Sequence, residues 1–218
     1  MDTGLTVGER IALLGLDERD GTPHDPLRVG AAVAAAPLLQ LVRCGGVVAE
    51  DGRLVAADRP APREPLAAAM AAQVREHPEA RPQAWLLAVR DQALTAAYDG
   101  LQAKGVVRRE GRKLLGAFGS YRYPVTDASV PEALRRELAG VVLDGAPAGP
   151  ETAELITLLH HAGLHTRALP DADPAAVKER MGELAARTGA SGAVGEAVSA
   201  ALAALTVLLV SVPGIAAG

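Results

Sequence analysis

Two groups of side chains in this sequence have types and spacings suited to binding or catalysis. The first is a run of cations and apolar residues within residues 106–124, made up of Arg108, Arg109, Arg112, Lys113, Leu114, Leu115 and Phe118. Cations beside exposed apolar residues suit an anionic membrane surface, where the cations meet headgroups and the apolar side chains enter the interface. The alternative interpretation is a solvated hairpin with Leu114 and Leu115 folded onto the core.

The second group consists of His160, His161 and His165, of which the last two are four residues apart. Two histidines at that spacing share a face of a helix, which is one way to bind a metal ion. However, no carboxylate or cysteine stands at ligand spacing beside them, and Gly163 is expected to end the helix before His165. We therefore expect no metal, and we interpret these histidines as polar groups at the C-terminal end of a helix.

Residue patterns typical of catalysis are absent from the sequence. Cys44 has no basic partner nearby, Ser191 does not stand in a G-x-S-x-G turn, and neither a P-loop nor a Rossmann glycine pattern occurs. We therefore expect a protein that is not an enzyme and holds no cofactor. An enzyme acting on an unidentified small molecule is the third hypothesis for function.

The composition indicates a folded, mainly α-helical protein. The chain has 218 residues, 49% of them apolar, mostly Ala, Leu and Val, which favours helix packed closely on helix in a single domain covering residues 1–218. The net charge of −4 gives no general attraction to nucleic acid or anionic lipid, so any anion-binding site must be a local patch. One cysteine and the lack of a basic, apolar, cleavable N-terminus favour a cytoplasmic location.

Hydrophobic periodicity and turn residues predict the elements that position these side chains. We expect a helix beginning at Thr6, which forms a capping box with Glu9, and further helices over residues 28–43, 66–77, 83–104, 130–142, 151–161, 174–187 and 194–212. Two hairpins are expected, within residues 47–56 and 106–124. Residues 197–212 contain no charge, and we interpret them as a buried apolar helix surrounded by amphipathic ones, with a membrane anchor as the alternative.

A helix–helix–hairpin order also occurs in winged-helix proteins. In such proteins basic residues on the hairpin contact DNA phosphates. A DNA-binding regulator that uses residues 106–124 as its wing is therefore the main alternative function.

Four segments together carry a resemblance that covers nearly the whole chain. They are residues 5–21 (LTVGERIALLGLDERDG), 94–110 (LTAAYDGLQAKGVVRRE), 152–169 (TAELITLLHHAGLHTRAL) and 194–205 (VGEAVSAALAAL). In this order they resemble the Golgi phosphoprotein 3 family, and the composition, rich in Ala, Arg and Gly and poor in Lys, is typical of a high-GC bacterial member. The resemblance implies a non-enzymatic peripheral membrane or adaptor protein whose apolar β-hairpin contacts the membrane and mediates self-association.

The family's lipid-binding residues are largely not matched. Its eukaryotic members bind phosphatidylinositol 4-phosphate through one Trp and three Arg and select the cytoplasmic tails of resident glycosyltransferases. The arginine positions correspond here to Ala34, Asp91 and Leu94, so the resemblance implies the fold more strongly than it implies phosphoinositide binding. Arg28 and Arg90 lie near these positions and are hypothetical substitutes. We thus expect anionic lipid as a partner at the inner face of the membrane, an unidentified protein partner and no nucleic acid.

Overall fold

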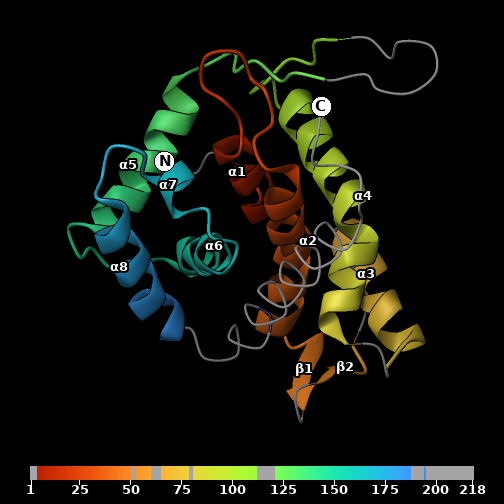
Figure 1. The fold of residues 1–218 in the computed structure, drawn as a ribbon. Coiled ribbons are helices and arrows are strands. Elements are labelled where there is room, and N and C mark those ends of the chain that lie inside the picture. The colour runs from red at the N-terminus through yellow and green to blue at the C-terminus, as the bar shows by residue number, and fades with distance from the viewer. Residues whose placement is uncertain are drawn as a thin grey trace, which may run out of the picture.

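The computed structural model describes residues 4–50, 53–59, 65–78, 81–111, 121–187 and 194. Within them lie α1 (Val7–Leu14), α2 (Pro26–Arg43), β1 (Val47–Glu50), β2 (Arg53–Ala56), α3 (Pro65–Glu76), α4 (Pro82–Ala103), α5 (Ser129–Val142), α6 (Pro150–His161), α7 (His165–Ala168) and α8 (Pro174–Ala186) (Figure 1). The prediction of a mainly α fold with a β-hairpin is confirmed. Residues 197–212, predicted to form the buried apolar helix, lie outside the described residues, so that interpretation stays a prediction.

Helix α1 lies between two groups of helices (Figure 1). It contacts α2 and α4 on one side and α5 and α6 on the other. In the first group α2 packs against α3 and α4, with the β1–β2 hairpin attached to α2 and α3, and in the second group α8 packs against α5, α6 and α7. The shared hydrophobic core runs through both groups, from Leu5 near the N-terminus to Met181 in α8.

The ends of the helices follow local rules that the sequence displays. Thr6 and Glu9 form the predicted capping box at the start of α1. A proline occupies the first position of α2, α3, α4, α6 and α8, because the amide that proline lacks has no partner within a helix at that position. Gly105 follows the last turn of α4 with a φ of 71°, as expected for a residue that ends a helix in the left-handed conformation.

Small residues let α2 and α4 approach closely. A Cβ placed on Gly30 of α2 would lie 3.6 Å from the Arg90 carbonyl oxygen of α4. The alanines that follow in α2 are all buried, including Ala32 and Ala34 at 0% exposure. The close packing of helix on helix that the Ala-rich composition predicts is therefore found between α2 and α4.

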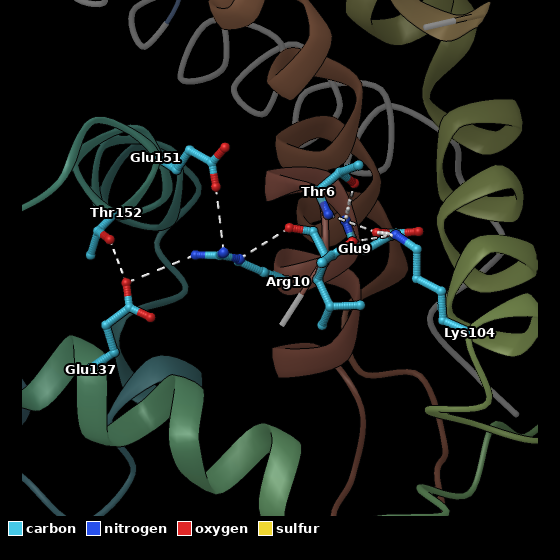
Figure 2. A network of polar contacts seen from close by, with 9 residues as sticks. Thr6, Glu9, Arg10, Lys104, Glu137, Glu151 and Thr152 are labelled. Atoms are coloured by element: carbon cyan, nitrogen blue, oxygen red, sulfur yellow. Dashed lines mark hydrogen bonds and ion pairs between the residues drawn. The ribbon is translucent and has the colours of Figure 1, made fainter. Parts of the chain in front are cut away.

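Two adjacent charged residues of α1 point in opposite directions (Figure 2). Glu9 accepts a hydrogen bond from the Thr6 amide at 2.7 Å and pairs with Lys104 Nζ at 2.5 Å, just beyond the end of α4. Since Glu9 is only 6% exposed, its charge is satisfied by these partners more than by water. This contact fixes α1 against the end of α4.

Arg10 makes the corresponding contacts on the other side of α1 (Figure 2). Its Nε donates to the Leu5 carbonyl at 3.2 Å, and its guanidinium lies 3.8 Å from Glu137 of α5 and 3.4 Å from Glu151 of α6. The Thr152 hydroxyl also donates to Glu137. Because a buried charge without a partner is costly, this arrangement favours one orientation of α1 against α5 and α6.

Candidate functional site

The segment after α4 leaves the helical body and returns antiparallel to itself. The Glu110 and Arg122 backbones exchange hydrogen bonds of 2.8 and 2.9 Å, and the Arg108 amide donates to the Pro124 carbonyl at 3.0 Å. A further antiparallel bridge joins Val107 and Val125. The two arms of the predicted second hairpin, residues 106–111 and 121–125, are therefore paired, and we call them the hairpin root. Residues 112–120, which include five of the seven predicted membrane-contact residues, lie outside the described part of the chain.

The loop between α1 and α2 holds the returning arm of the hairpin root. The Gly21 carbonyl accepts a hydrogen bond of 2.7 Å from the Tyr123 amide, and Asp20 lies 3.6 Å from the Arg122 guanidinium. Gly21 has a φ of 70°, and a Cβ there would overlap the backbone of Tyr123 and Pro124. Only glycine fits this close approach, so the loop and the arm are in direct backbone contact.

This loop is itself stabilised by short-range polar contacts. His24 Nε2 lies 3.1 Å from an Asp17 oxygen, and this contact is the main reason why the pKa of Asp17 is lowered from its usual value. The Thr22 amide donates to Asp20 at 2.9 Å, and the contacts of Asp20 with Thr22 lower the pKa of that carboxyl as well. Glu18 reaches away from the hairpin root to Arg135 of α5 at 2.7 Å. The loop thus connects the hairpin root to α5.

Aromatic contacts complete the hairpin root. The rings of Tyr98 in α4 and Tyr123 are stacked, with centroids 4.1 Å apart. The guanidinium of Arg109 lies 3.8 Å from the centre of the Tyr121 ring, a cation–π contact. Burial raises the pKa of both Tyr98 and Tyr123, so both rings stay neutral at physiological pH.

The charges of the hairpin root are partly balanced. Arg108 pairs with Glu110 at 2.8 Å, and Arg122 lies beside Asp20. Arg108 remains 67% exposed in this pair, so its guanidinium is still available to an external anion. The described part of the hairpin therefore presents arginines to solvent, but with less net charge than the sequence alone suggests.

The structure places the two hypothetical headgroup residues on different sides of α2. Arg28 donates to the Ala162 carbonyl of α6 at 3.3 Å and pairs with Asp25 at 2.9 Å. Arg90 packs against α2 at Gly30 and pairs with its neighbour Asp91 at 3.1 Å. Residues 28 and 30 are two positions apart on the helix and face in nearly opposite directions. Arg28 and Arg90 therefore do not converge on one site.

The three positions that correspond to the family's arginines hold no cation. Ala34 is fully buried, and Leu94 is 9% exposed and faces Gly30 of α2. Asp91 is 84% exposed, so it presents a negative charge where the family has a positive one. Because Asp91 is paired with Arg90 at 3.1 Å, the two side chains together carry no net positive charge.

Two carboxylates of α6, exposed Glu151 and buried Glu154, are engaged in ion pairs. Glu151 and Glu154 line a hollow of about 220 Å³ between α1, α2, α4 and α6. Glu154 pairs with Arg43 at 2.7 Å, while burial raises the pKa of its carboxyl. Glu151 pairs with Arg10. These ion pairs join α6 to α2 and to α1, so the two carboxylates have a structural role.

The structure contains contacts at this site that the sequence analysis did not find. The contacts of the loop of residues 17–24 with Tyr123 and Arg135 join residues more than 100 positions apart, and no sequence pattern predicted them. Short α7 was also missed. Among the described residues, no group of three or more His, Cys, Asp or Glu side chains is placed to hold a metal ion.

The helical core and the hairpin root together place this chain among mainly α-helical proteins that have an arginine-bearing β-hairpin after a long helix. The chain belongs to the Golgi phosphoprotein 3 (GPP34) family, whose family model matches residues 7–205. This family is non-enzymatic and Golgi-associated. No curated protein matches the chain. In the described part of the chain, no helix has the length and apolar character needed to cross a membrane.

Proposed function

We propose that this protein is a non-enzymatic peripheral adaptor that contacts anionic membrane lipid through the hairpin of residues 106–124. The observation that carries the proposal is the hairpin root. Exposed Arg108 and Arg109 stand on its outgoing arm, which pairs with a returning arm held by backbone contact with Gly21 and by the Tyr98–Tyr123 stack. Side chains on a firmly held backbone lose less conformational entropy when they bind a partner, which favours binding by the arginines of the hairpin root. Membership of the family supports the same assignment.

The expected affinity is modest. A cation near an anionic surface contributes about 1 kcal/mol, and the pairing of Arg108 with Glu110 reduces its share. Leu114, Leu115 and Phe118 would add about 1.5–3 kcal/mol for each side chain that is fully inserted. Two or three such contacts give the weak, reversible binding of a peripheral protein at the inner face of the membrane.

Binding should not be selective for phosphatidylinositol 4-phosphate. Ala34, Asp91 and Leu94 supply no cation, and Arg28 and Arg90 are each paired with an aspartate on different sides of α2. We expect affinity to follow the total negative charge of the membrane and not the position of a phosphate on the headgroup. A second copy of the chain, joined through the hairpin, and a further protein are the other partners we propose.

Co-sedimentation with vesicles tests the proposal. The wild type, Arg108→Glu/Arg109→Glu and Leu114→Ser/Leu115→Ser would be compared on phosphatidylcholine vesicles and on vesicles that also contain phosphatidylglycerol, at low and high salt. Both variants should lose affinity for the anionic vesicles, and only the loss in the arginine variant should shrink at high salt. A further vesicle set with phosphatidylinositol 4-phosphate at equal total charge tests selectivity.

The matched control is Arg75→Glu/Arg136→Glu, which makes the same change in net charge on exposed positions of α3 and α5. This control should bind as the wild type does. Undiminished binding by both hairpin variants, equal loss in the control, or tight binding specific for phosphatidylinositol 4-phosphate would each contradict the proposal. Salt-dependent binding of the wild type to DNA in place of vesicles would favour the winged-helix hypothesis instead.

A further inference from the structure

Three histidines, His160, His161 and His165, lie where α6, α7 and α8 converge. His160 in the last turn of α6 packs against α8 at Gly182, where a Cβ would lie 3.0 Å from the imidazole Cε1. His161 stands beside it, with the two rings edge to face and their centroids 5.3 Å apart. His165 begins α7, which also contacts α8. Helix α8 therefore packs directly against the His160 ring and contacts the helix that His165 begins.

The charged groups that act on His160 and His165 are positive. Lys178 of α8 acts on both His160 and His165, and Arg28 of α2 acts on His165. Arg28 is itself paired with Asp25 at 2.9 Å. No carboxylate of the described residues is among the groups that act electrostatically on either imidazole. An added proton would therefore be repelled and not balanced.

The hydrogen bonding of the rings also favours their neutral form. The Nδ1 atoms of His160 and His165 are shielded from solvent and have no hydrogen-bond partner. In a neutral imidazole one ring nitrogen carries no hydrogen, whereas a protonated imidazole has two N–H donors. Protonation would thus bury a donor without an acceptor beside Lys178, which is unfavourable.

We propose that the junction of α6, α7 and α8 is a proton-sensitive latch, in which α8 stays docked while His160 and His165 are neutral and loosens when they are protonated. This inference is independent of the proposed membrane contact, because none of its residues belongs to the hairpin. Val177 and Met181 of α8 are fully buried in the core, so loosening of α8 would expose both side chains to solvent.

The direction of the pH dependence follows from the pKa values. Burial is the first cause that lowers the pKa of both histidines, and Lys178 adds to it, while a backbone hydrogen bond at Lys178 opposes the shift of His160. The folded state therefore binds protons more weakly than the unfolded chain. The stabilisation is fully present above the usual His pKa of about 6.5 and is lost as the pH falls from there through the folded-state pKa.

The experiment measures urea unfolding of the full chain at pH of about 7.5 and about 5, on either side of the usual His pKa. The wild type should lose stability at the lower pH, with up to a tenfold smaller folding constant for each unit by which a histidine pKa is lowered. His160→Gln/His165→Gln should lose most of this pH dependence. His77→Gln, an exposed histidine at the end of α3, is the matched control and should keep it.

A second variant and a direct titration keep the test decisive if the double variant fails to fold. Lys178→Gln removes the facing charge at an exposed position and should reduce the loss of stability at the lower pH. NMR titration of the wild type should show His160 and His165 titrating below the usual value. The proposal is wrong if the wild type is equally stable at both pH values, if Lys178→Gln changes nothing, or if both histidines titrate at or above that value.

Discussion

Replacement of Gly21 by alanine tests whether the loop of residues 17–24 holds the hairpin root. Gly21 has a φ of 70°, which costs about 1–2 kcal/mol for a residue with a Cβ. In addition, the new Cβ would overlap the backbone of Tyr123 and Pro124, which cannot move aside as a flexible side chain can. The loop would have to separate from the arm, and the Tyr123 amide, now bonded to the Gly21 carbonyl at 2.7 Å, would lose its partner.

The magnitude follows from these two contributions. An unsatisfied buried amide costs about 1–3 kcal/mol, so Gly21→Ala should reduce the free energy of unfolding by about 2–5 kcal/mol in total. The matched control is Gly145→Ala in the loop after α5, where φ is 74° but no atom lies within 4 Å of the new Cβ. That variant should lose only the backbone contribution of about 1–2 kcal/mol.

Urea unfolding of both variants gives the comparison, and vesicle co-sedimentation of Gly21→Ala then reports whether a loosened root weakens membrane binding. The reasoning fails if Gly21→Ala is no less stable than Gly145→Ala. That result would mean that the contact between the loop and Tyr123 does not contribute to the stability of the folded protein.

Three further predictions concern the core. Glu137→Gln/Glu151→Gln should destabilise the protein by about 1.5–3 kcal/mol in urea unfolding, because Arg10, only 7% exposed, would keep its charge without a carboxylate, and adding Arg10→Met should recover part of the loss. Equal stability of the double variant and the wild type would contradict this. Tyr98→Phe should stay within about 1 kcal/mol of the wild type or exceed it, since the Tyr98 hydroxyl is shielded from solvent without a partner. Leu205→Asp should unfold the protein by circular dichroism if residues 197–212 form the predicted buried helix, and a folded variant would refute that prediction.

The parts of the fold that depend on neighbouring residues were predictable from the sequence. The capping box of Thr6 and Glu9, the end of α4 at Gly105 and the β1–β2 hairpin all involve residues a few positions apart. Most helices begin slightly earlier than expected, as α2 does at Pro26, because proline at the first position of a helix was interpreted as part of the preceding loop. Short α7 has too few residues to show a hydrophobic period.

The parts that depend on distant residues were not predictable. Nothing in the sequence near Gly21 indicates that Tyr123 will approach it, and the pairing of Arg10 with Glu151 joins residues 141 positions apart. The cations of the candidate site were identified from their spacing with apolar residues. Only the structure shows that Glu110 pairs with Arg108 and that Asp20 lies beside Arg122. Asp20 comes from a loop about 100 positions earlier in the chain, so its approach could not be predicted.

The position of α1 has a consequence for how the protein is made. This helix is translated before the other described helices, and the partners of its charges, Lys104, Glu137 and Glu151, are translated much later. At about 5–20 residues per second, Arg10 would wait roughly 7–28 seconds for Glu151 to be synthesised. Until then α1 has apolar residues and two charges without their final partners, so a nascent chain released before α6 should be a better chaperone substrate than one released after it.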